Sequence, residues 1–332
     1  MTSEVVALTI GDPNGIGPEI AVKAAVLCVD ANDGPPPILV GDEHVLRFYA
    51  DRFAPRHPLL RHDSGPADRP ALRYLDVDAL AKQAFQPGRG CAEGGRATVA
   101  YVEAALRLMS EGHAGSIVAC PHSETNVNAA GIAFSGYPNL LARLKKVPED
   151  EVFLMLVGAG LRIVHVTLHE RLFDALGRIT PKLIERAIRT TIDALRNLGI
   201  NRPKIGVLGI NPHAGEGGLF GDDDDRIVKP LVERLKAEGI DVSGPVGADL
   251  MLGQQGFDAF VAMYHDQGHI PIKLLAGRNS AAMSIGAGLM FSSVGHGSAF
   301  DIAGKGIADP GPVLRCIRLV AGASQFEGNP VR

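Results

Sequence analysis

The sequence predicts an α/β protein built from two α/β domains. Short apolar runs rich in Val, Ile and Leu alternate with longer segments of helical periodicity, which is typical of a mainly parallel sheet covered by helices. Three of the apolar runs end in a histidine. With 332 residues the chain is long for one domain and comfortable for two, and its apolar fraction of 46% is ordinary for a globular protein.

The N-terminal segment begins with a predicted strand over Glu4–Ile10. It runs into the glycine-rich turn Gly11–Glu19 and a helix that starts at Pro18, because proline is tolerated in a first helical turn. A strand, glycines and a helix N-terminus form a geometry that binds phosphate, so Gly15 and Gly17 are candidates to approach a cofactor or substrate phosphate. The spacing of a dinucleotide fingerprint is not met, and the same glycines could simply make a tight turn.

The following segments alternate in the same way. Pro35–Gly41 predicts a loop and then a strand, whereas residues 51–72, rich in Pro, Arg, His and Asp, predict a loop. Ala97–Met109 has the apolar spacing of a helix. Ser116–Pro121 predicts another strand, and His122–Asn126 a polar loop after it.

The second half continues with two paired strands, Leu154–Val157 and Arg162–Val166, around a Gly-Ala-Gly turn. A helix is then predicted up to about Leu198, with Thr180 as its N-cap and Pro181 at its first position.

Two more strands and a helix are predicted beyond residue 200. Lys204–His213 predicts a strand that ends in a histidine, Ile227–Glu238 a helix, and Phe257–Met263 a buried strand. The acidic run Asp222–Asp225 predicts a solvated loop, or a helix start favoured by the helix dipole. A metal site there is the less favoured alternative, because four adjacent side chains cannot all converge on one ion.

Three histidines, His169, His213 and His265, each follow an apolar run. Ligands of open α/β sheets bind at the carboxyl ends of the strands, and imidazole is the commonest metal ligand. Three histidines with an open position suit a catalytic divalent ion. The chain has 11 histidines, a single one at a strand end is more often hydrogen-bonded within a loop, and zinc-finger or thermolysin-type spacing is absent. The metal prediction therefore depends on the shared placement of the three.

Composition excludes several classes of protein. A net charge of -4 without a Lys/Arg run argues against a nucleic-acid-binding protein. No segment has about 18 uninterrupted apolar residues and the N-terminus lacks a signal-peptide pattern, so we expect no membrane span. The four cysteines are far apart and form no CxxC, which is typical of reduced thiols in a cytoplasmic protein.

Four stretches together are highly specific: Gly11–Glu19, Asn211–Gly218, Met263–Gly268 and His296–Ala299. Through them the chain resembles the 4-hydroxythreonine-4-phosphate dehydrogenase family over nearly its whole length. His296–Pro310 is also similar to the adenine-side loop of isopropylmalate and isocitrate dehydrogenases. The resemblance implies two isocitrate/isopropylmalate dehydrogenase-like α/β domains with a central cleft. Residues 1–125 plus 270–332 would form the first, with the NAD-side loop, and 126–269 the second, with the dimer interface and the metal histidines.

The same resemblance implies NAD and one divalent metal ion per site. It implies that His169, His213 and His265 hold the ion, and that one of them comes from the partner subunit of a homodimer. Histidine ligands suit zinc, and cobalt, manganese or magnesium could serve.

Three further residues are candidate catalytic groups. Asp249 and Asp266 are placed to orient the metal ligands by hydrogen bonding, with a helix or turn cap as the alternative for each. Lys273 is a candidate for handling a proton or for binding a substrate carboxylate.

The cofactor residues implied by the dehydrogenase-like tail are His296, Gly297, Asp301 and Asp309, beside the two glycines of the first turn. A carboxylate at Asp301 would bond the adenosine ribose 2′-hydroxyl and repel a 2′-phosphate, which favours NAD over NADP. An N-cap role for Asp301 is the alternative.

The substrate pocket departs from the family's pattern. The hydroxythreonine-phosphate enzymes have a His-Thr pair where this chain has Tyr137 and Pro138. Their substrate-binding Asn falls at Ala282 and their Arg at Phe291, whereas their lysine is kept as Lys273. Losing the arginine removes a bidentate, charge-assisted contact to a phosphate.

These positions resemble a narrower subgroup, the terephthalate dihydrodiol dehydrogenases, through Cys120–Thr125, Ala133–Pro138, Phe153–His169 and Ser292–Ser298. The subgroup's substrate, 1,2-dihydroxy-3,5-cyclohexadiene-1,4-dicarboxylate, carries a ring and carboxylates but no phosphate. The substrate contacts that the resemblance implies are Lys273, Tyr137, Ser135, Phe291 and His122.

Both candidate substrates carry a hydroxyl β to a carboxylate. Hydride transfer to NAD gives a β-keto acid, which loses carbon dioxide when a Lewis acid stabilises its carbonyl oxygen. The resemblance implies oxidation of the dihydrodiol to protocatechuate and carbon dioxide. The alternative is 4-phosphohydroxy-L-threonine in pyridoxal phosphate biosynthesis, with Arg278 or Lys305 as the phosphate's cation. A metal-dependent hydrolase or lyase without NAD is less favoured.

Overall fold

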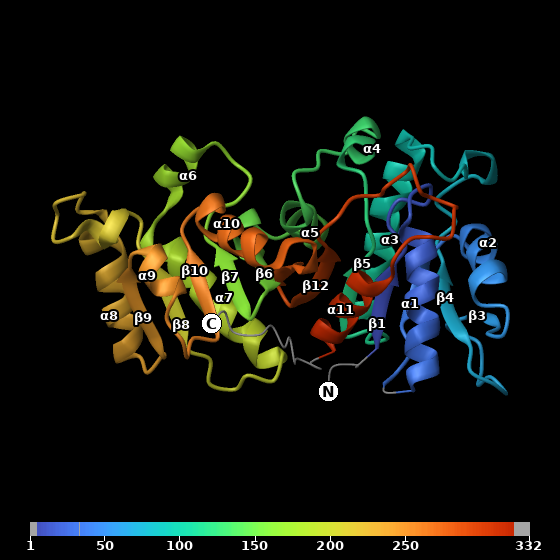
Figure 1. The fold of residues 1–332 in the computed structure, drawn as a ribbon, viewed down its shortest axis with the longest axis horizontal. Coiled ribbons are helices and arrows are strands. Elements are labelled where there is room, and N and C mark those ends of the chain that lie inside the picture. Colours follow the sequence, from blue (N-terminus) through green and yellow to red (C-terminus); the bar gives the residue numbers. More distant parts are fainter. Residues whose placement is uncertain (1–4, 33, 322–332) are drawn as a thin grey trace. The chain divides into compact units, whose positions relative to one another are not determined.

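The structure is a computed structural model that describes residues 5–32 and 34–321. It divides into two compact units, the first comprising the described residues up to Gly136 and from Met290 onward, and the second comprising Tyr137–Leu289. Each unit is a sheet with helices packed on it (Figure 1), which confirms the predicted α/β class. Among the described residues, no helix is both long and apolar enough to cross a lipid bilayer.

The boundaries between the units differ from the predicted ones at residues 126–136 and 270–289. Residues 126–136 belong to the first unit rather than the second, because helix α4 (Glu124–Ala129) packs on helix α3 (Ala92–Ser110). Residues 270–289 belong to the second unit rather than the first, because strand β11 (Ala281–Gly286) pairs antiparallel with strand β6 (Phe153–Gly158).

The first unit carries a parallel sheet in the order β3-β4-β2-β1-β5-β12. Its strands are β1 (Val6–Thr9), β2 (Ile38–Gly41), β3 (Leu59–Arg61), β4 (Leu72–Asp76), β5 (Ser116–Ala119) and β12 (Leu289–Val294). Its longer helices, besides α3, are α1 (Gly17–Ala31), α2 (Glu43–Phe53) and α11 (Gly311–Val320). The loop predicted over residues 51–72 was wrong at β3, because a strand of three residues is too short to show a period.

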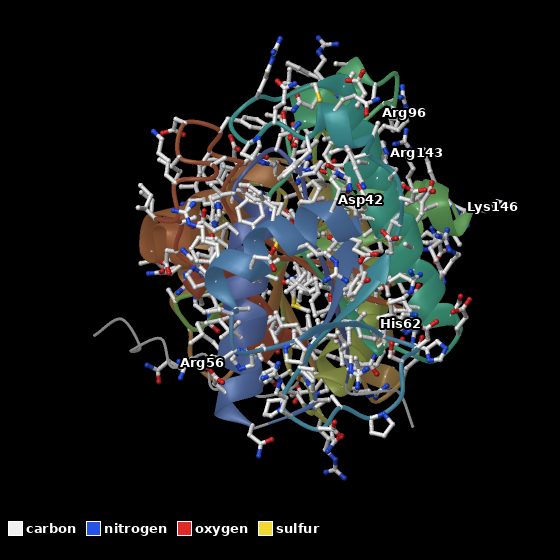
Figure 2. All side chains as sticks on the ribbon, turned by 90° about the vertical axis from the view of Figure 1, so that its right-hand side faces the viewer. Asp42, Arg56, His62, Arg96, Arg143 and Lys146 are labelled. Carbon is white, nitrogen blue, oxygen red and sulfur yellow. The ribbon has the colours of Figure 1, made fainter. Side chains whose placement is uncertain are left out.

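A buried carboxylate ties this unit together. Asp42, labelled in Figure 2, is fully buried before α2 and accepts hydrogen bonds from Ala79 N (2.6 Å), Leu80 N (2.9 Å) and the Tyr101 hydroxyl (2.6 Å). Because a buried charge costs several kcal/mol when it is unpaired, these bonds are what allow an aspartate at this position.

The second unit carries a mixed sheet in the order β11-β6-β7-β10-β8-β9. Strand β6 runs antiparallel to both of its neighbours, and the predicted hairpin with β7 is present, whereas β7, β10, β8 and β9 are parallel. The remaining strands are β7 (Leu161–His165), β8 (Ile205–Leu208), β9 (Val242–Val246) and β10 (Ala259–Ala262). The helices are α5 (Tyr137–Lys145), α6 (Leu172–Arg178), α7 (Pro181–Asn197), α8 (Lys229–Ala237), α9 (Ala248–Leu252) and α10 (His265–Ala276).

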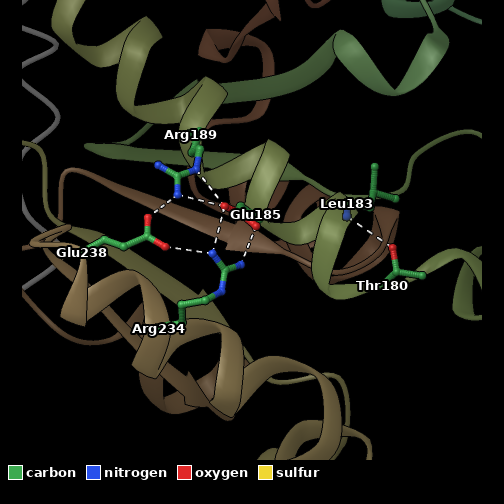
Figure 3. Close-up of polar contacts among 6 residues, drawn as sticks. All are labelled: Thr180, Leu183, Glu185, Arg189, Arg234 and Glu238. Carbon is green, nitrogen blue, oxygen red and sulfur yellow. Dashed lines mark hydrogen bonds and ion pairs between the residues drawn. The ribbon is translucent and has the colours of Figure 1, made fainter.

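Helix α7 begins as predicted, with Thr180 as its N-cap accepting a hydrogen bond from Leu183 N at 3.3 Å (Figure 3). Its polar face meets α8 through a network of two arginines and two glutamates, Glu185, Arg189, Arg234 and Glu238, which Figure 3 shows as one connected set. The network is largely solvent-exposed, so we expect it to orient α8 on α7 rather than to hold the core.

The order of strands in the second unit places the candidate site. Strand β10 pairs in parallel with β7 on one side and with β8 on the other. These are the three strands that precede the predicted histidines, so their carboxyl ends lie side by side at one edge of the sheet.

Candidate functional site

The segment after β10 is a helix. Helix α10 begins at His265 and also contains Asp266, His269 and Lys273. Positions four and eight residues apart share one face of an α-helix, so His265, His269 and Lys273 line the same side of α10.

Three hydrogen bonds hold the strand ends together below this helix. The Gln267 side chain donates to Gly209 O (2.7 Å), at the end of β8, and accepts from Met263 N (2.7 Å), at the end of β10. The Thr167 hydroxyl, after β7, donates to Met263 O (2.8 Å). The exits of the three strands are therefore fixed relative to one another.

An imidazole cluster, which we define as His169, His265 and His269, lies at these strand ends. Each ring offers a nitrogen, and the three nitrogens lie within 4.8 Å of one another. The His265 and His269 rings stack with centroids 3.6 Å apart and 13° between their planes, and the His169 centroid lies 5.4 Å from that of His265.

The surroundings of His269 and of the neighbouring His165 disfavour the charged form of each imidazole. Burial, and then the neighbouring His265 and His169, lower the pKa of His269 to about 4. Burial lowers the pKa of His165, which lies beneath the cluster, to about 3. Neutral imidazole is a preferred ligand of zinc, so a set of three imidazole donors fits a divalent ion such as zinc.

Asp266 lies where a ligand-orienting carboxylate is expected. Its Oδ1 is 2.6 Å from His265 Nδ1. Because the carboxylate accepts a hydrogen bond from Nδ1–H, Nε2 of His265 is left with its lone pair for a metal.

A pocket of about 490 Å³ adjoins the cluster within the second unit. It is lined by Leu168, His169, Glu170, Leu172, Ala175, Tyr264, His265 and Asp266. This volume lies in the usual range for small-molecule sites.

His213 lies apart from the imidazole cluster. It follows β8 in a short 3₁₀ turn, where its φ of 54° turns the backbone, and its side chain is 58% exposed with Nδ1 3.6 Å from Glu216 Oε2. Asp249 lies beside this turn, because a Cβ on Gly247 would be 2.9 Å from the Asp249 carboxylate and 3.4 Å from His213 Cα. Of the predicted metal ligands, the structure therefore brings together His169 and His265, with His269 in addition.

The acidic run at 222–225 is not simply a solvated loop. Asp224 is buried, and its two oxygens accept hydrogen bonds from Ile210 N (2.7 Å) and Asn211 N (2.9 Å). Asp223 accepts one from the Asn211 side chain (3.1 Å). The helix-start alternative is confirmed, because a π-helical turn over Asp224–Val228 leads into α8. The solvated-loop alternative is wrong at Asp224, because the backbone groups that it binds lie outside the acidic run and are invisible in a local pattern.

We expect Asp224→Ala to lower the free energy of unfolding by roughly 3 kcal/mol, because two partly buried backbone N–H groups lose a charged acceptor. Urea denaturation measures this directly. Asp225→Ala is the matched control, since Asp225 is exposed with only a 3.5 Å pair to Lys229. Equal stability of the two variants would contradict the anchoring role.

The two glycines of the first turn have a packing explanation. A Cβ on Gly17 would lie 2.1 Å from Ile10 O, and one on Gly15 would lie 2.7 Å from Ser298 Cβ. Gly15 thus lies against the segment predicted to bind NAD, although the contact itself is made by the protein.

That segment is clamped to α1 by two residues absent from the predicted site. Glu19 accepts hydrogen bonds from Gly306 N (3.1 Å) and Ala308 N (2.9 Å), and Lys23 donates to both carbonyls. Asp309 accepts from Gly311 N at 2.9 Å and so caps α11.

The other predicted NAD contacts are accessible. Asp301 and Gly297 are exposed, and His296 Nδ1 lies 3.3 Å from Gly297 O.

The predicted substrate contacts have mixed surroundings. Phe291 is 0% exposed within β12, so its ring has no surface free for a substrate, and its predicted contact role is not supported. Tyr137 is also buried, whereas Ser135 is exposed. The His122 ring packs edge-on against Phe134, with the two ring centroids 4.8 Å apart. Burial lowers the pKa of His122 to about 4.

Of the cations considered for a substrate anion, Lys273 is exposed, with Nζ 3.1 Å from Ser280 Oγ. Lys305 is exposed in the clamped segment. The side chain of Arg278 lies outside the part that the structure describes.

Comparison with known proteins gives consistent matches over nearly the whole chain. The family model described as "Pyridoxal phosphate biosynthetic protein PdxA" matches residues 34–320. A 1,2-dihydroxy-3,5-cyclohexadiene-1,4-dicarboxylate dehydrogenase of Comamonas sp is 48% identical over 95% of this chain and 96% of its own. A 4-hydroxythreonine-4-phosphate dehydrogenase of Maricaulis maris is 37% identical over 94% and 95%, respectively.

A solved structure supports the same relationship. The crystal structure of a terephthalate 1,2-cis-dihydrodiol dehydrogenase from Burkholderia xenovorans LB400 superimposes with a TM-score of 0.77 at 52% identity, covering 96% of this chain and 98% of that one.

Proposed function

The chain belongs to the family of the pyridoxal phosphate biosynthetic protein PdxA, and we propose that it is a metal- and NAD-dependent dehydrogenase that oxidises and decarboxylates 1,2-dihydroxy-3,5-cyclohexadiene-1,4-dicarboxylate to protocatechuate. The observation that carries the proposal is the 48% identity, over 95% of this chain, to a dehydrogenase named for that compound. The absence of the family's arginine and asparagine, at Phe291 and Ala282, supports it further.

We assign each residue of the site a role in this reaction. A bound divalent ion would polarise the reacting oxygen, and NAD would accept the hydride. His169 and His265 would hold the ion, and Asp266 would keep His265 in the correct tautomer. Lys273, on the same face of α10, would bind a substrate carboxylate or hold a proton at Nζ.

His213 would join this site as a further ligand, with Asp249 supporting its turn. The Asp224 anchor supports this role, because it holds the backbone at Ile210 and Asn211 just before the histidine. Zinc is the proposed metal, because the donors are imidazoles rather than carboxylates.

For the cofactor, we expect NAD to be preferred to NADP, and Asp301→Asn to narrow the preference by about tenfold, since one charged hydrogen bond is worth roughly 1.5 kcal/mol or more. Initial rates with each cofactor measure the ratio. The matched control is Asp51→Asn, which alters an exposed aspartate on α2 of the same unit. Equal rates with both cofactors in the unmodified protein would contradict the role of Asp301.

We also propose a homodimer. Large apolar side chains that are exposed in one chain gather on α6, on the loop before residue 221 and on α10, close to the imidazole cluster: Leu172, Phe173, Leu176, Leu219, Phe220, Ile270, Leu274 and Leu275. Exposed apolar surface of this kind marks an interface, and a second copy of the chain would cover it.

If the partner subunit's His213 completes the metal site, mixed dimers of His213→Ala and His265→Ala chains should regain part of the activity that each homodimer lacks, because one of their two sites keeps every ligand. Sedimentation should show a dimer. A fully active monomer, or no recovery in mixed dimers, would refute a shared site.

The cytoplasm is the proposed compartment. The four cysteines, all within the described residues, form no disulfide, and burial raises the pKa of Cys316 to about 11, so its thiol is unreactive. Buried, unpaired thiols are typical of a reducing environment.

The test of the proposed function is the appearance of NADH absorbance when the dihydrodiol is added to protein, NAD and zinc. We expect turnover that a chelator abolishes and zinc restores. NADH formation with 4-phosphohydroxy-L-threonine but not with the dihydrodiol would favour the alternative activity. The 37% identical 4-hydroxythreonine-4-phosphate dehydrogenase supports that alternative.

A further inference from the structure

His269 has no role in the activity described so far, yet it is the third member of the imidazole cluster. We propose that His269 is a ligand of the same divalent ion as His169 and His265, and that His165 fixes the tautomer in which it binds. The inference rests on the metal dependence of the proposed function and adds two residues to its site.

The spacing along α10 is the first argument. His265 and His269 are four residues apart on a helix, the same separation as the two zinc-binding histidines of the HExxH helix. Their rings lie on one face, and both present a nitrogen within 4.8 Å of one on His169. Two histidines from one helix and one from a neighbouring strand end would leave a coordination position open toward the pocket.

The tautomer of His165 is the second argument. Its Nδ1 lies 3.2 Å from Leu154 O, and because a carbonyl only accepts, Nδ1 carries the proton. The side chain is 1% exposed, and within the part of the chain that the structure describes its polar partners are this carbonyl and His269. A second proton would leave a buried charge without a counterion, so Nε2 keeps its lone pair.

The orientation of His269 follows from that lone pair. His269 Nδ1 lies 3.0 Å from His165 Nε2, so His269 donates its Nδ1 proton there. Its own Nε2 then carries a lone pair, as Nε2 of His265 does when Asp266 accepts at Nδ1. Both rings are thus held in the tautomer that a metal requires, one by a carboxylate and one by a buried imidazole.

Gly268 supports the same arrangement independently. A Cβ at this position would lie 2.4 Å from His165 Nε2 and 2.9 Å from Ile163 Cγ2. The backbone of α10 can therefore approach His165 closely only because residue 268 is glycine, and this approach brings His269 into hydrogen-bonding range.

The first test is zinc binding by chelator-treated protein, measured by calorimetry without substrate or cofactor. We expect His269→Leu, which keeps the side chain's approximate volume, to bind zinc about 100-fold more weakly than the unmodified protein. His113→Gln, an exposed histidine of the first unit, is the matched control and should bind normally. Unchanged zinc affinity in His269→Leu, with or without a raised KM, would overturn the proposal.

The two proposals fail in different ways. If the unmodified protein binds no divalent ion, the metal dependence of the proposed function is wrong and the inference falls with it. If the unmodified protein binds zinc and His269→Leu binds it equally well, only the inference is wrong.

The second test reads the tautomers directly. In metal-free protein with ¹⁵N-labelled histidine, NMR should show His269 protonated at Nδ1 and bare at Nε2, with the signal assigned by its loss in His269→Leu. Adding zinc should shift the Nε2 resonance. In His165→Leu we expect the Nδ1 preference to disappear and zinc affinity to fall about tenfold, within the range for removing a ligand's hydrogen-bond partner. A His269 protonated at Nε2 in the unmodified protein would overturn the assigned role of His165.

Discussion

Replacing His265 with alanine is expected to lower kcat/KM by about 1,000-fold or more while leaving the fold intact. The residue is placed to hold the ion that stabilises the developing negative charge, and losing several kcal/mol of that stabilisation gives a factor of this size. The stability cost is small because its side chain is 36% exposed and lies at a helix start outside the apolar core. Turnover measures the loss of activity, the content of bound metal measures the loss of the ion, and circular dichroism checks that the fold is intact, all on the same preparation.

The matched control is again the exposed His113→Gln, which should retain activity and metal. A His265→Ala protein that keeps both metal and turnover would contradict the placement of the site. A protein that loses its fold would show instead that the cluster is structural.

The preference for the dihydrodiol over the phosphorylated substrate is expected to be as large as the effect of the His265 substitution. The resemblance to the hydroxythreonine-phosphate enzymes implies that Phe291 and Ala282 stand where those enzymes have a phosphate-binding arginine and an asparagine, and neither side chain can pair with a phosphate. A phosphate dianion left without a paired cation costs several kcal/mol, so we expect kcat/KM for 4-phosphohydroxy-L-threonine to be about 1,000-fold below that for the dihydrodiol.

The comparison needs the same zinc and NAD concentrations for both compounds. Unphosphorylated 4-hydroxy-L-threonine is the control substrate, because it separates rejection of the phosphate from rejection of the amino acid skeleton. Efficient oxidation of the phosphorylated compound would show that other cations take over from the missing arginine.

Much of the fold was predictable because strands and helices follow from local periodicity. The strands before His169, His213 and His265 were identified from apolar runs, and their parallel pairing follows from the α/β class. The short strand β3 was missed because three residues carry no detectable period.

The site was predictable only in part, for a specific reason. The four-residue spacing between His265 and His269 is visible in the sequence, but it carries meaning only on a helix, and no helix was predicted after the strand Phe257–Met263. Because α10 is a helix, His265 and His269 lie on one helical face and can act as two ligands of one ion. The contact of His269 with His165 joins residues 104 positions apart, so no local pattern could show it.

Two other residues also show that a role that depends on tertiary packing cannot be predicted from a local pattern. Asp224 looked solvated within an acidic run, but it holds the turn before His213 through distant backbone groups. Phe291 looked like a substrate contact by position, but it packs inside β12. In both cases burial, which depends on tertiary packing, determined the role.

The most direct test of the central claim is the stoichiometry of a single reaction of the dihydrodiol with enzyme, NAD and zinc. We predict equal amounts of NADH, carbon dioxide and protocatechuate, with none of the three formed after chelation. Formation of NADH without carbon dioxide or protocatechuate, or no NADH at all with zinc bound, would contradict the account.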